Sequence, residues 1–370
     1  MDAAEKLWWR KVLVGPNGSI VSDGADGSSE RYAALPRASD PRVFVDLDCP
    51  KAMDDAIDRM VSSRTTNSTI RGLASPVSSL VGRRKADWLA SSDDEMGTLR
   101  EHLSDILGRP VKLWVSVGPP RPNRKPVVRC YAGNEMVAFA KLGPDAHTKA
   151  MVENEASWLK RFMTEPLEEV VTPELIYAGS YGETALILMS PLDLVDDLGV
   201  SIGEMPKETL AQFLQERTES GLSVRDTPWW KDLAERLGDE KGESVASAVS
   251  RITDDSLFDA LEISAWHGDW SPWNTGTTRS GKLAIWDWER AAEGVPAGLD
   301  LLHLHYQYGV GLSGATLDLA SLGIPTSHHR RLHVLYLLEL CARHTEADAL
   351  KTPRHRRVLD ALDGVLNDWA

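Results

Sequence analysis

Three side chains with oxygen ligands stand close together in the sequence and combine the groups that phosphoryl transfer needs. Asp269 and Asn274 are five residues apart in a segment that a glycine and a proline make non-helical. Asp287 ends a short apolar strand thirteen residues after Asn274. Carboxylate and amide oxygens on a loop and a strand end can share Mg²⁺, which takes one or two such ligands and completes its octahedron with phosphates and water. The remaining carboxylate can then orient a hydroxyl nucleophile.

These residues and their neighbours also allow other interpretations. A loop aspartate is often only a turn or capping residue, but the joint spacing of Asp269 with Asn274 and Asp287 favours function. Glu289 either lines a substrate site or pairs with Arg290. Aromatic residues around the loop are more often packing residues than ligand platforms; they are Trp270, Trp273, Trp286 and Trp288. Trp270 and Trp273 are near enough to the base to touch an acceptor.

The sequence upstream of this segment predicts a small antiparallel sheet. Alternating apolar residues predict strands over 111–117, 127–131 and 136–142, with a tight turn between the last two. A helix containing Glu155 follows, and the continuous apolar run 185–189 predicts a buried strand. Strands, a helix and a further strand in this order indicate an α+β arrangement.

The sequence after Pro191 is mostly helical, and the loop and strand described above interrupt it. The spacing of apolar residues predicts helices over 207–219, 243–261, 299–308, 328–343 and 354–369. These helices must support the segment that holds Asp269 and Asp287.

The first hundred residues carry weaker signals and no chemistry. An alternating pattern predicts a strand over 42–47, and an amphipathic pattern predicts a helix over 50–60. Residues 92–95 fit a capping box that opens a helix ending near Leu107. Three roles stay open for this stretch: it caps a nucleotide-binding lobe, adds strands to its sheet or binds a partner.

The chain resembles the aminoglycoside phosphotransferase and choline kinase-like family of the protein-kinase-like fold over about 111–369. The motifs that carry the resemblance are His267-Gly-Asp269 with Asn274, and Asp287-Trp-Glu289 with Gly294, Pro296 and Asp300-Leu. The resemblance implies a bilobal α+β protein with a small antiparallel-sheet N-lobe and a larger, mainly helical C-lobe. The expected parts are an N-terminal extension (1–108), a nucleotide-binding N-lobe (109–190) and a C-lobe with catalytic loop and acceptor site (191–370).

The resemblance also implies a role for each matching residue. Asp269 matches the catalytic carboxylate that receives or steers the proton of the acceptor hydroxyl. His267 belongs to the same catalytic motif and is expected to brace the loop. Asn274 and Asp287 match the metal ligands, and Asp300 is expected to tether the loop from the following helix or to be an ordinary acidic residue at a helix start.

The nucleotide contacts expected in the N-lobe follow from the same resemblance. Lys141 matches the strand lysine that contacts the α- and β-phosphates, and a helix glutamate holds this lysine in the family. A lysine among apolar neighbours needs a carboxylate partner because burial of a lone ammonium is costly. Glu155 is the better candidate and Glu153 is the alternative. A lysine of an edge strand that reaches solvent is the competing interpretation of Lys141.

Further nucleotide contacts are expected at the first hairpin and at the lobe junction. No GxGxxG segment covers the phosphates, which is a departure from protein kinases. Arg124 and Lys125 can grip phosphate oxygens, or they form an ordinary solvated hairpin. Met189 and Pro191 fall where kinases bind adenine through backbone groups. ATP or GTP with Mg²⁺ is therefore the expected co-substrate.

Composition limits the classes of partner. The formal net charge of −14 argues against a nucleic-acid binder, which needs a basic surface. The N-terminus has acidic residues where a signal peptide needs a basic and then an apolar run, and no apolar stretch is long enough to span a membrane. Three widely spaced cysteines form no disulfide framework. We expect a cytoplasmic protein without nucleic-acid or membrane partners.

The expected acceptor is the hydroxyl of a small molecule, such as an aminoglycoside-like antibiotic, a sugar or a natural-product intermediate. Acidic residues in the C-lobe would suit an amine-bearing acceptor, although a net charge of −14 accounts for such clusters anyway. One alternative is a Ser/Thr kinase that acts on a modified peptide bound through the N-terminal extension. A further alternative is a pseudokinase scaffold.

Overall fold

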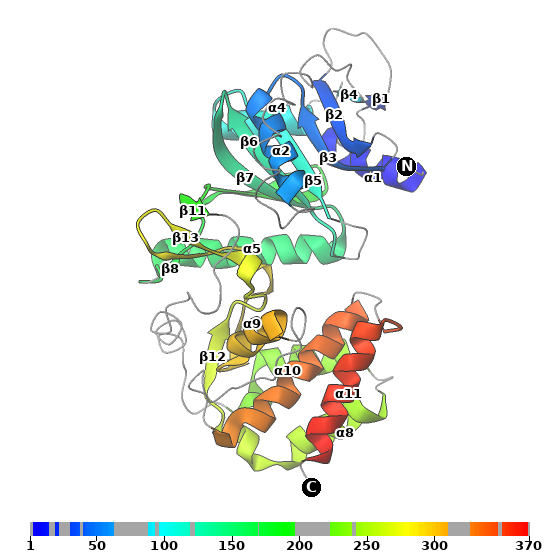
Figure 1. Ribbon diagram of the computed structural model, residues 1–370, viewed down its shortest axis with the longest axis vertical. Coiled ribbons are helices and arrows are strands. Elements are labelled where there is room, and N and C mark those ends of the chain that lie inside the picture. The colour runs from blue at the N-terminus through cyan, green and yellow to red at the C-terminus, as the bar shows by residue number, and fades with distance from the viewer. Residues whose placement is uncertain are drawn as a thin grey trace. The chain divides into compact units, whose positions relative to one another are not determined.

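The structure is a computed structural model, and the chain forms two compact units (Figure 1). Unit 1 comprises Met1–Ala156 and Glu174–Pro191, and unit 2 comprises Ser157–Pro173 and Leu192–Ala370. The residues that the structure describes are 3–14, 19–21, 30–37, 40–62, 88–92, 96–118, 123–168, 170–196, 223–238, 242–309, 326–346 and 350–368. The helix predicted over 207–219 lies outside them.

Unit 1 is built on a nine-stranded sheet in the order β1-β4-β2-β3-β5-β6-β7-β10-β9, with antiparallel neighbours throughout. Its strands are β1 (Ser19–Val21), β2 (Glu30–Arg37), β3 (Asp40–Asp46), β4 (Trp88–Ser91), β5 (Lys112–Val117), β6 (Pro126–Ala132), β7 (Glu135–Gly143), β9 (Leu175–Tyr181) and β10 (Thr184–Met189). The strands predicted between 111 and 189 are confirmed. The first four strands come from the N-terminal hundred residues, so this stretch adds strands to the same sheet.

Helices cover both faces of this sheet. They are α1 (Ala3–Val14) and α4 (Leu99–Leu107) on one face and α2 (Pro50–Ser62) on the other. The helix α5 (Ala146–Thr164) follows β7, and its last part from Ser157 belongs to unit 2. Because side chains alternate along a strand, Leu113 and Val115 of β5 join a core with Trp9 of α1 and Leu103 of α4. Trp114 points to the opposite face and packs with α2. The alternation of side chains along β5 therefore determines which helices pack on each face of the sheet.

The start of α4 differs from the prediction. The capping box that opens α4 is formed by Thr98 and Glu101, whereas residues 93–95 of the predicted box lie outside the described residues. The Thr98 hydroxyl accepts the backbone N–H of Glu101 at 3.2 Å, and the Glu101 carboxylate accepts the N–H of Thr98 at 2.7 Å. Gly97 has a φ of 66°, a left-handed conformation that a continuing helix cannot contain, so the helix begins after it.

Unit 2 combines two small sheets with helices. One sheet has the order β11-β13-β14-β8, and the other pairs β12 with β15. Its strands are β8 (Val170–Val171), β11 (Leu194–Asp196), β12 (Ile263–Trp266), β13 (Thr275–Thr278), β14 (Leu283–Ile285) and β15 (Ala292–Pro296). Only β14, which lies in the apolar run 283–286, is predicted from the sequence.

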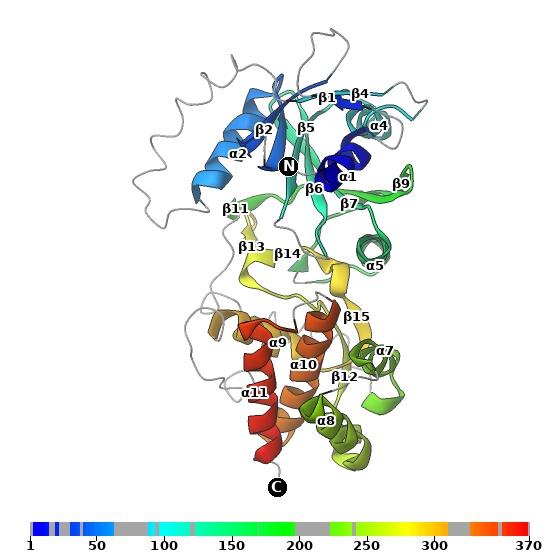
Figure 2. The same cartoon turned by 90° about the vertical axis from the view of Figure 1, so that its right-hand side faces the viewer.

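The helices of unit 2 include two long ones near the C-terminus, α10 and α11, which Figure 2 shows side by side. The helices are α7 (Pro228–Leu237), α8 (Glu243–Asp254), α9 (Leu299–Gly309), α10 (Thr326–Glu346) and α11 (Pro353–Asn367). The helix predicted over 243–261 is too long. Asp255 is extended, its carboxylate accepts the N–H of Leu257 at 2.9 Å, and a separate 3₁₀ turn follows over Ser256–Ala260.

The antiparallel sheet of unit 1 and the helices of unit 2 confirm the predicted α+β class. Among the described residues, no helix has both the length and the apolar character that a membrane crossing requires.

Candidate active site

The loop that carries Asp269 follows β12 and is fastened at its start by Asp300. Asp300 lies in the first turn of α9 and is buried. Its two carboxylate oxygens accept the backbone N–H groups of His267 at 2.6 Å and Gly268 at 3.0 Å. Burial raises the pKa of Asp300 to about 7, although the two backbone donors act in the opposite direction. The tether expected from the resemblance is therefore present as a contact between α9 and the loop.

Glycine is required at position 268 for two reasons. Gly268 has a φ of 81°, which side-chain-bearing residues rarely adopt. A Cβ atom there would also collide with the carbonyl oxygen of Arg290. The loop can turn tightly after β12 only because this side chain is missing.

Asp269 is held in one orientation by its neighbours. His303 Nε2 lies 3.0 Å from Asp269 Oδ1, and Asn274 Nδ2 donates to Asp269 Oδ2 at 3.2 Å. Asn274 Nδ2 also donates to the Asp269 backbone carbonyl at 2.9 Å. Burial alone would raise the pKa of Asp269, but the hydrogen bond from His303 and the charge of Arg343 lower it. Asp269 is thus kept as an anion that can accept a proton or a hydrogen bond.

His267 braces the loop from inside. Its Nδ1 accepts the backbone N–H of Asp269 at 3.1 Å, so its Nε2 carries the proton that it donates to the Trp286 carbonyl at 3.0 Å. The ring packs edge-to-face on Trp288, with 4.6 Å between ring centroids. Complete burial lowers the pKa of His267 to about 4. Both ring nitrogens of His267 are hydrogen-bonded to backbone groups. His267 therefore holds the loop, and with it Asp269, in position.

Asp287 is placed beside the loop by the peptide that precedes it. The backbone N–H of Trp286 donates to the Asn274 carbonyl at 3.1 Å, while His267 holds the Trp286 carbonyl. Asp287 then takes a left-handed conformation with a φ of 73°, the only positive φ among the described non-glycine residues. Such strain persists where the surroundings enforce it, which is common at functional sites.

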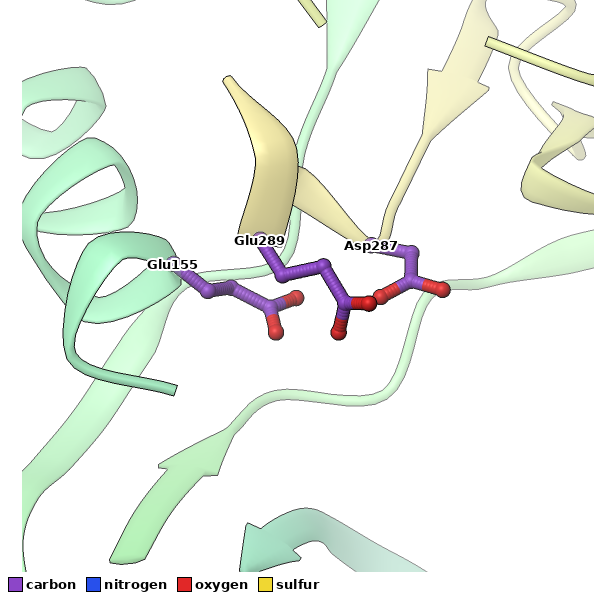
Figure 3. Close-up of side chains that lie close together, drawn as sticks. All are labelled: Glu155, Asp287 and Glu289. Atoms are coloured by element: carbon purple, nitrogen blue, oxygen red, sulfur yellow. The ribbon is translucent and has the colours of Figure 1, made fainter. Parts of the chain in front are cut away.

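Glu289 lies next to Asp287, and Figure 3 shows their carboxylates side by side after β14. Their ligand oxygens lie within 4.8 Å of each other. Glu289 is buried, whereas Arg290 pairs with Glu346 of α10 at 3.5 Å. Of the two interpretations left open by the sequence, the burial of Glu289 beside Asp287 favours a residue that lines a site over one that only pairs with Arg290.

The donor set around Asp287 fits Mg²⁺. Carboxylate and amide oxygens are the hard ligands that this cation prefers. Because the amide nitrogen of Asn274 faces Asp269, its amide oxygen is the atom with which it would bind a cation. Asn274, Asp287 and Glu289 thus offer three oxygen-bearing side chains, two of them carboxylates.

The lysine and glutamate of unit 1 form a buried ion pair. Lys141 Nζ on β7 lies 2.7 Å from Oε1 and 2.6 Å from Oε2 of Glu155 on α5. Glu155 is completely buried and Lys141 nearly so. Glu153, the alternative partner, pairs with Lys149 on the exposed side of α5. The helix periodicity therefore turns Glu155 toward the sheet and Glu153 toward solvent.

The remaining candidate residues of unit 1 also lie on or beside the sheet. The Arg124 guanidinium stacks over Trp8 at 4.6 Å from the ring centroid. Lys125 Nζ lies 3.7 Å from the sulfur of Met151 on α5. Met189 ends β10 in the interior, and Pro191 is the last residue of unit 1.

Sequence reasoning missed three residues behind the loop. His303 contacts Asp269, Tyr336 contacts His303, and Arg343 Nη2 donates to the Gly268 carbonyl at 2.6 Å. A signal existed for His303, which follows Asp300 by three residues and therefore shares its helix face. Tyr336 and Arg343 are two helical turns apart, which predicts only that they face the same way.

The tryptophans around the loop divide into buried and exposed ones. Trp266, Trp270 and Trp288 are buried, and Trp286 is partly buried. Trp273, which precedes Asn274, is 52% exposed. Among the tryptophans named above, it is therefore the most open to an acceptor.

Comparisons with known proteins identify similar folds but no close relative. No family model matches the sequence, and no curated protein matches it. A putative fructosamine-3-kinase from Haemophilus somnus 129PT is 12% identical, covers 72% of this chain and 96% of that chain, and gives a TM-score of 0.49. The GDP complex of wild-type aminoglycoside 2′-phosphotransferase-IIIa is 17% identical, with coverages of 66% and 90% and a TM-score of 0.45.

A further match is a thermostable mutant of the aminoglycoside phosphotransferase APH(4)-Ia in a ternary complex with ADP and hygromycin B. It is 13% identical, with coverages of 73% of this chain and 98% of that chain and a TM-score of 0.46. The structural matches thus include aminoglycoside phosphotransferases, which the sequence resembles. At this degree of similarity the activities of the matched proteins do not transfer to this chain, and its function must be inferred from its own residues.

Proposed function

We propose that this chain is a phosphotransferase that moves the γ-phosphoryl group of ATP or GTP, with Mg²⁺, to a hydroxyl of a small molecule. The observation that carries this proposal is the arrangement within unit 2, where an oriented aspartate anion adjoins a set of hard oxygen ligands. Phosphoryl transfer requires little covalent chemistry from the protein and depends on positioning and charge.

Asp269 steers the acceptor in this proposal. Its side chain is 28% exposed, and hydrogen bonds from His303 and Asn274 keep the carboxylate fixed. An anion in this state accepts a hydrogen bond from the acceptor hydroxyl and turns the oxygen lone pair toward the γ-phosphorus. As the new oxygen–phosphorus bond forms, the hydroxyl proton passes to Asp269, and the bond to the leaving nucleoside diphosphate breaks.

Asn274 and Asp287 would hold the Mg²⁺, with Glu289 as a further oxygen donor. The cation supplies charge neutralisation of the polyphosphate when it is bound. The chain itself fixes these oxygens, because the Asn274 and Trp286 backbones are hydrogen-bonded to each other. Fixed ligands lose little freedom on binding and so favour one geometry of the donor.

Lys141 supports the assignment of unit 1 to the nucleotide. Its ammonium group is held by both oxygens of Glu155 in a largely buried position. A buried ion pair contributes little to stability on average, so a functional reason for keeping it is plausible on physical grounds. A fixed ammonium group is suited to the α- and β-phosphates of a nucleotide.

Three acidic residues of the C-lobe that would suit an amine-bearing acceptor form ion pairs with arginines. Asp193, Asp255 and Asp259 pair with Arg279, Arg331 and Arg225, respectively. These pairs reduce the negative charge that a cationic acceptor would meet. The proposal therefore names a hydroxyl-bearing small molecule and does not require it to be an amine.

The proposal is tested by calorimetric titration of ATP and of GTP, each with Mg²⁺, into the wild type and Asp287→Ala. We expect Mg²⁺-dependent binding of one nucleotide that weakens at least tenfold in the variant, about 1.4 kcal/mol. Asp363→Ala removes an exposed carboxylate of α11 and serves as the matched control. Binding of neither nucleotide by folded wild type would contradict the proposal and favour a scaffold.

Turnover is tested with a panel of hydroxyl-bearing sugars, aminoglycosides and peptides, by release of the nucleoside diphosphate. Asp269→Asn should abolish acceptor-dependent turnover and leave nucleotide affinity unchanged. Full activity of this variant would exclude Asp269 as the group that steers the hydroxyl. Transfer to peptides alone would establish the alternative of a peptide kinase.

A further inference from the structure

Behind Asp269, two side chains from different helices form a continuous hydrogen-bonded chain. The Tyr336 hydroxyl on α10 lies 3.1 Å from His303 Nδ1, and His303 Nε2 on α9 lies 3.0 Å from Asp269 Oδ1. Tyr336 is 2% exposed and His303 is 1% exposed, so water has little access to either hydrogen bond. These two hydrogen bonds join the loop that carries Asp269 to α9 and α10, which contact each other.

Hydrogen-bond chemistry gives this chain a direction. An ionised carboxylate only accepts hydrogen bonds, so the proton must lie on His303 Nε2. Burial lowers the pKa of His303 and favours its neutral ring, in which Nδ1 is then an acceptor. The Tyr336 hydroxyl therefore donates to Nδ1, and His303 donates to Asp269. Tyr336 thereby determines the tautomer of the ring, as second partners of functional histidines commonly do.

The two oxygens of Asp269 are consequently not equivalent. Oδ1 is occupied from the buried side by His303. Oδ2 receives a longer hydrogen bond from Asn274, at 3.2 Å, in a side chain that is 28% exposed as a whole. A carboxylate held at one oxygen by a rigid donor cannot rotate freely about its Cβ–Cγ bond.

We propose that His303 is a positioning residue that fixes the Asp269 carboxylate, with Tyr336 setting its tautomer, so that Oδ2 meets the acceptor hydroxyl. This inference rests on the proposed function. It adds a specific pair of residues and a specific oxygen to that function. His303 itself lies behind Asp269 and does not contact the acceptor.

The expected kinetic effect is confined to turnover. Without the donor from His303, the carboxylate samples other orientations, and displacement of a reacting group by about 1 Å can reduce the rate by about 10²-fold. His303→Leu should therefore lower kcat by about 10²-fold and change the KM for the nucleotide by less than about twofold. Tyr336→Phe should give a smaller loss because the ring remains but its tautomer is no longer fixed.

A conservative variant separates positioning from simple packing. The side-chain amide of glutamine places an N–H donor near the position of Nε2, so His303→Gln should recover most of the activity that His303→Leu loses. His355→Gln changes another buried histidine of unit 2, which contacts His344 and not the loop, and serves as the matched control. If glutamine restores nothing, or if folded His303→Leu turns over like the wild type, the inference is wrong.

The tautomer can be measured without turnover. In ¹⁵N-labelled full-length protein, the His303 signal, assigned by its loss in His303→Gln, should show a protonated Nε2 and an unprotonated Nδ1. Tyr336→Phe should alter the Nδ1 shift, and Asp269→Ala should move the Nε2 proton upfield. A protonated Nδ1 with a bare Nε2 would overturn the inference. A wild type that binds nucleotide but transfers phosphate to no acceptor would instead refute the proposed function.

Discussion

Arg343 of α10 donates a hydrogen bond from its Nη2 to the backbone carbonyl of Gly268 at 2.6 Å. Gly268 lies two residues after the end of β12. The N–H of the same glycine is held by Asp300 of α9. Gly268 is thus fastened at both its polar groups by charged side chains from two helices. A loop with a left-handed residue at this point is held in place by these contacts, and its conformation determines where Asp269 lies.

Arg343→Met is expected to destabilise the protein and to slow turnover. It removes the donor to the Gly268 carbonyl and one partner of buried Glu339, which keeps its ion pair with Arg236. We expect the free energy of unfolding to fall by about 2 kcal/mol. Urea unfolding and steady-state kinetics measure both effects. Arg343→Lys keeps the charge and should recover part of the stability; an equal loss in both variants would show that the charge is unimportant.

Asp300→Asn tests the tether on the N–H side of the loop. An amide has one acceptor oxygen, so one of the two N–H groups of the loop would face an NH₂ group. We expect a loss of about 1–3 kcal/mol in stability and a lower kcat, because a buried donor is left unsatisfied. Asp363→Asn on exposed α11 is the matched control. An Asp300→Asn protein with wild-type unfolding midpoint and turnover would show that the tether is dispensable.

The effect of the Lys141–Glu155 ion pair can be distinguished from that of a neighbouring ion pair, Lys149–Glu153, on the same helix. Glu155→Gln leaves the Lys141 ammonium largely buried without its counter-charge, which should cost about 3 kcal/mol of stability and weaken nucleotide binding. Glu153→Gln changes the exposed pair with Lys149 and should cost less than about 1 kcal/mol. Chemical unfolding and nucleotide titration distinguish the two. Similar effects of the two substitutions would argue against a special role for Glu155.

The loop and the strand that carry the motif residues could be predicted from the sequence because their signals are local. The strand before Asp287 and the loop glycine and proline place Asp269, Asn274 and Asp287 without knowledge of distant contacts. The helix that begins near residue 299 is equally clear from its apolar spacing. In each case, neighbouring residues within one element provide the whole signal.

The supporting residues could not be predicted in the same way, because their roles depend on contacts far along the chain. His303 is 34 residues from Asp269, and Arg343 is 75 residues from Gly268. Only the packing of α9 and α10 makes these contacts. The sequence likewise left open whether the N-terminal stretch adds strands to the sheet, since β3 pairs with β5 across the segment 47–111. Local patterns predict elements, but tertiary packing decides which elements meet.

The histidine pair between α10 and α11 predicts that acid destabilises the protein. His344 Nδ1 and His355 Nδ1 lie 3.1 Å apart, so one must donate and the other accept. Burial is the main reason that the pKa of His344 is lowered to about 4 and that the pKa of His355 is also lowered from 6.5. Protonation of both rings would place two donors and two positive charges against each other.

The sign of the effect follows from proton binding. Between pH 6.5 and about 4, the unfolded chain binds protons at these histidines that the folded chain does not. The stability contributed by the neutral pair is therefore complete above pH 6.5 and is lost as the pH falls toward 4. Urea unfolding at pH 7.5 and pH 5 should show a smaller loss of stability for His344→Asn combined with His355→Asn than for the wild type. His147→Asn, an exposed histidine of unit 1, should retain the wild-type difference. An unchanged pH dependence in the double variant would mean that other groups determine acid unfolding.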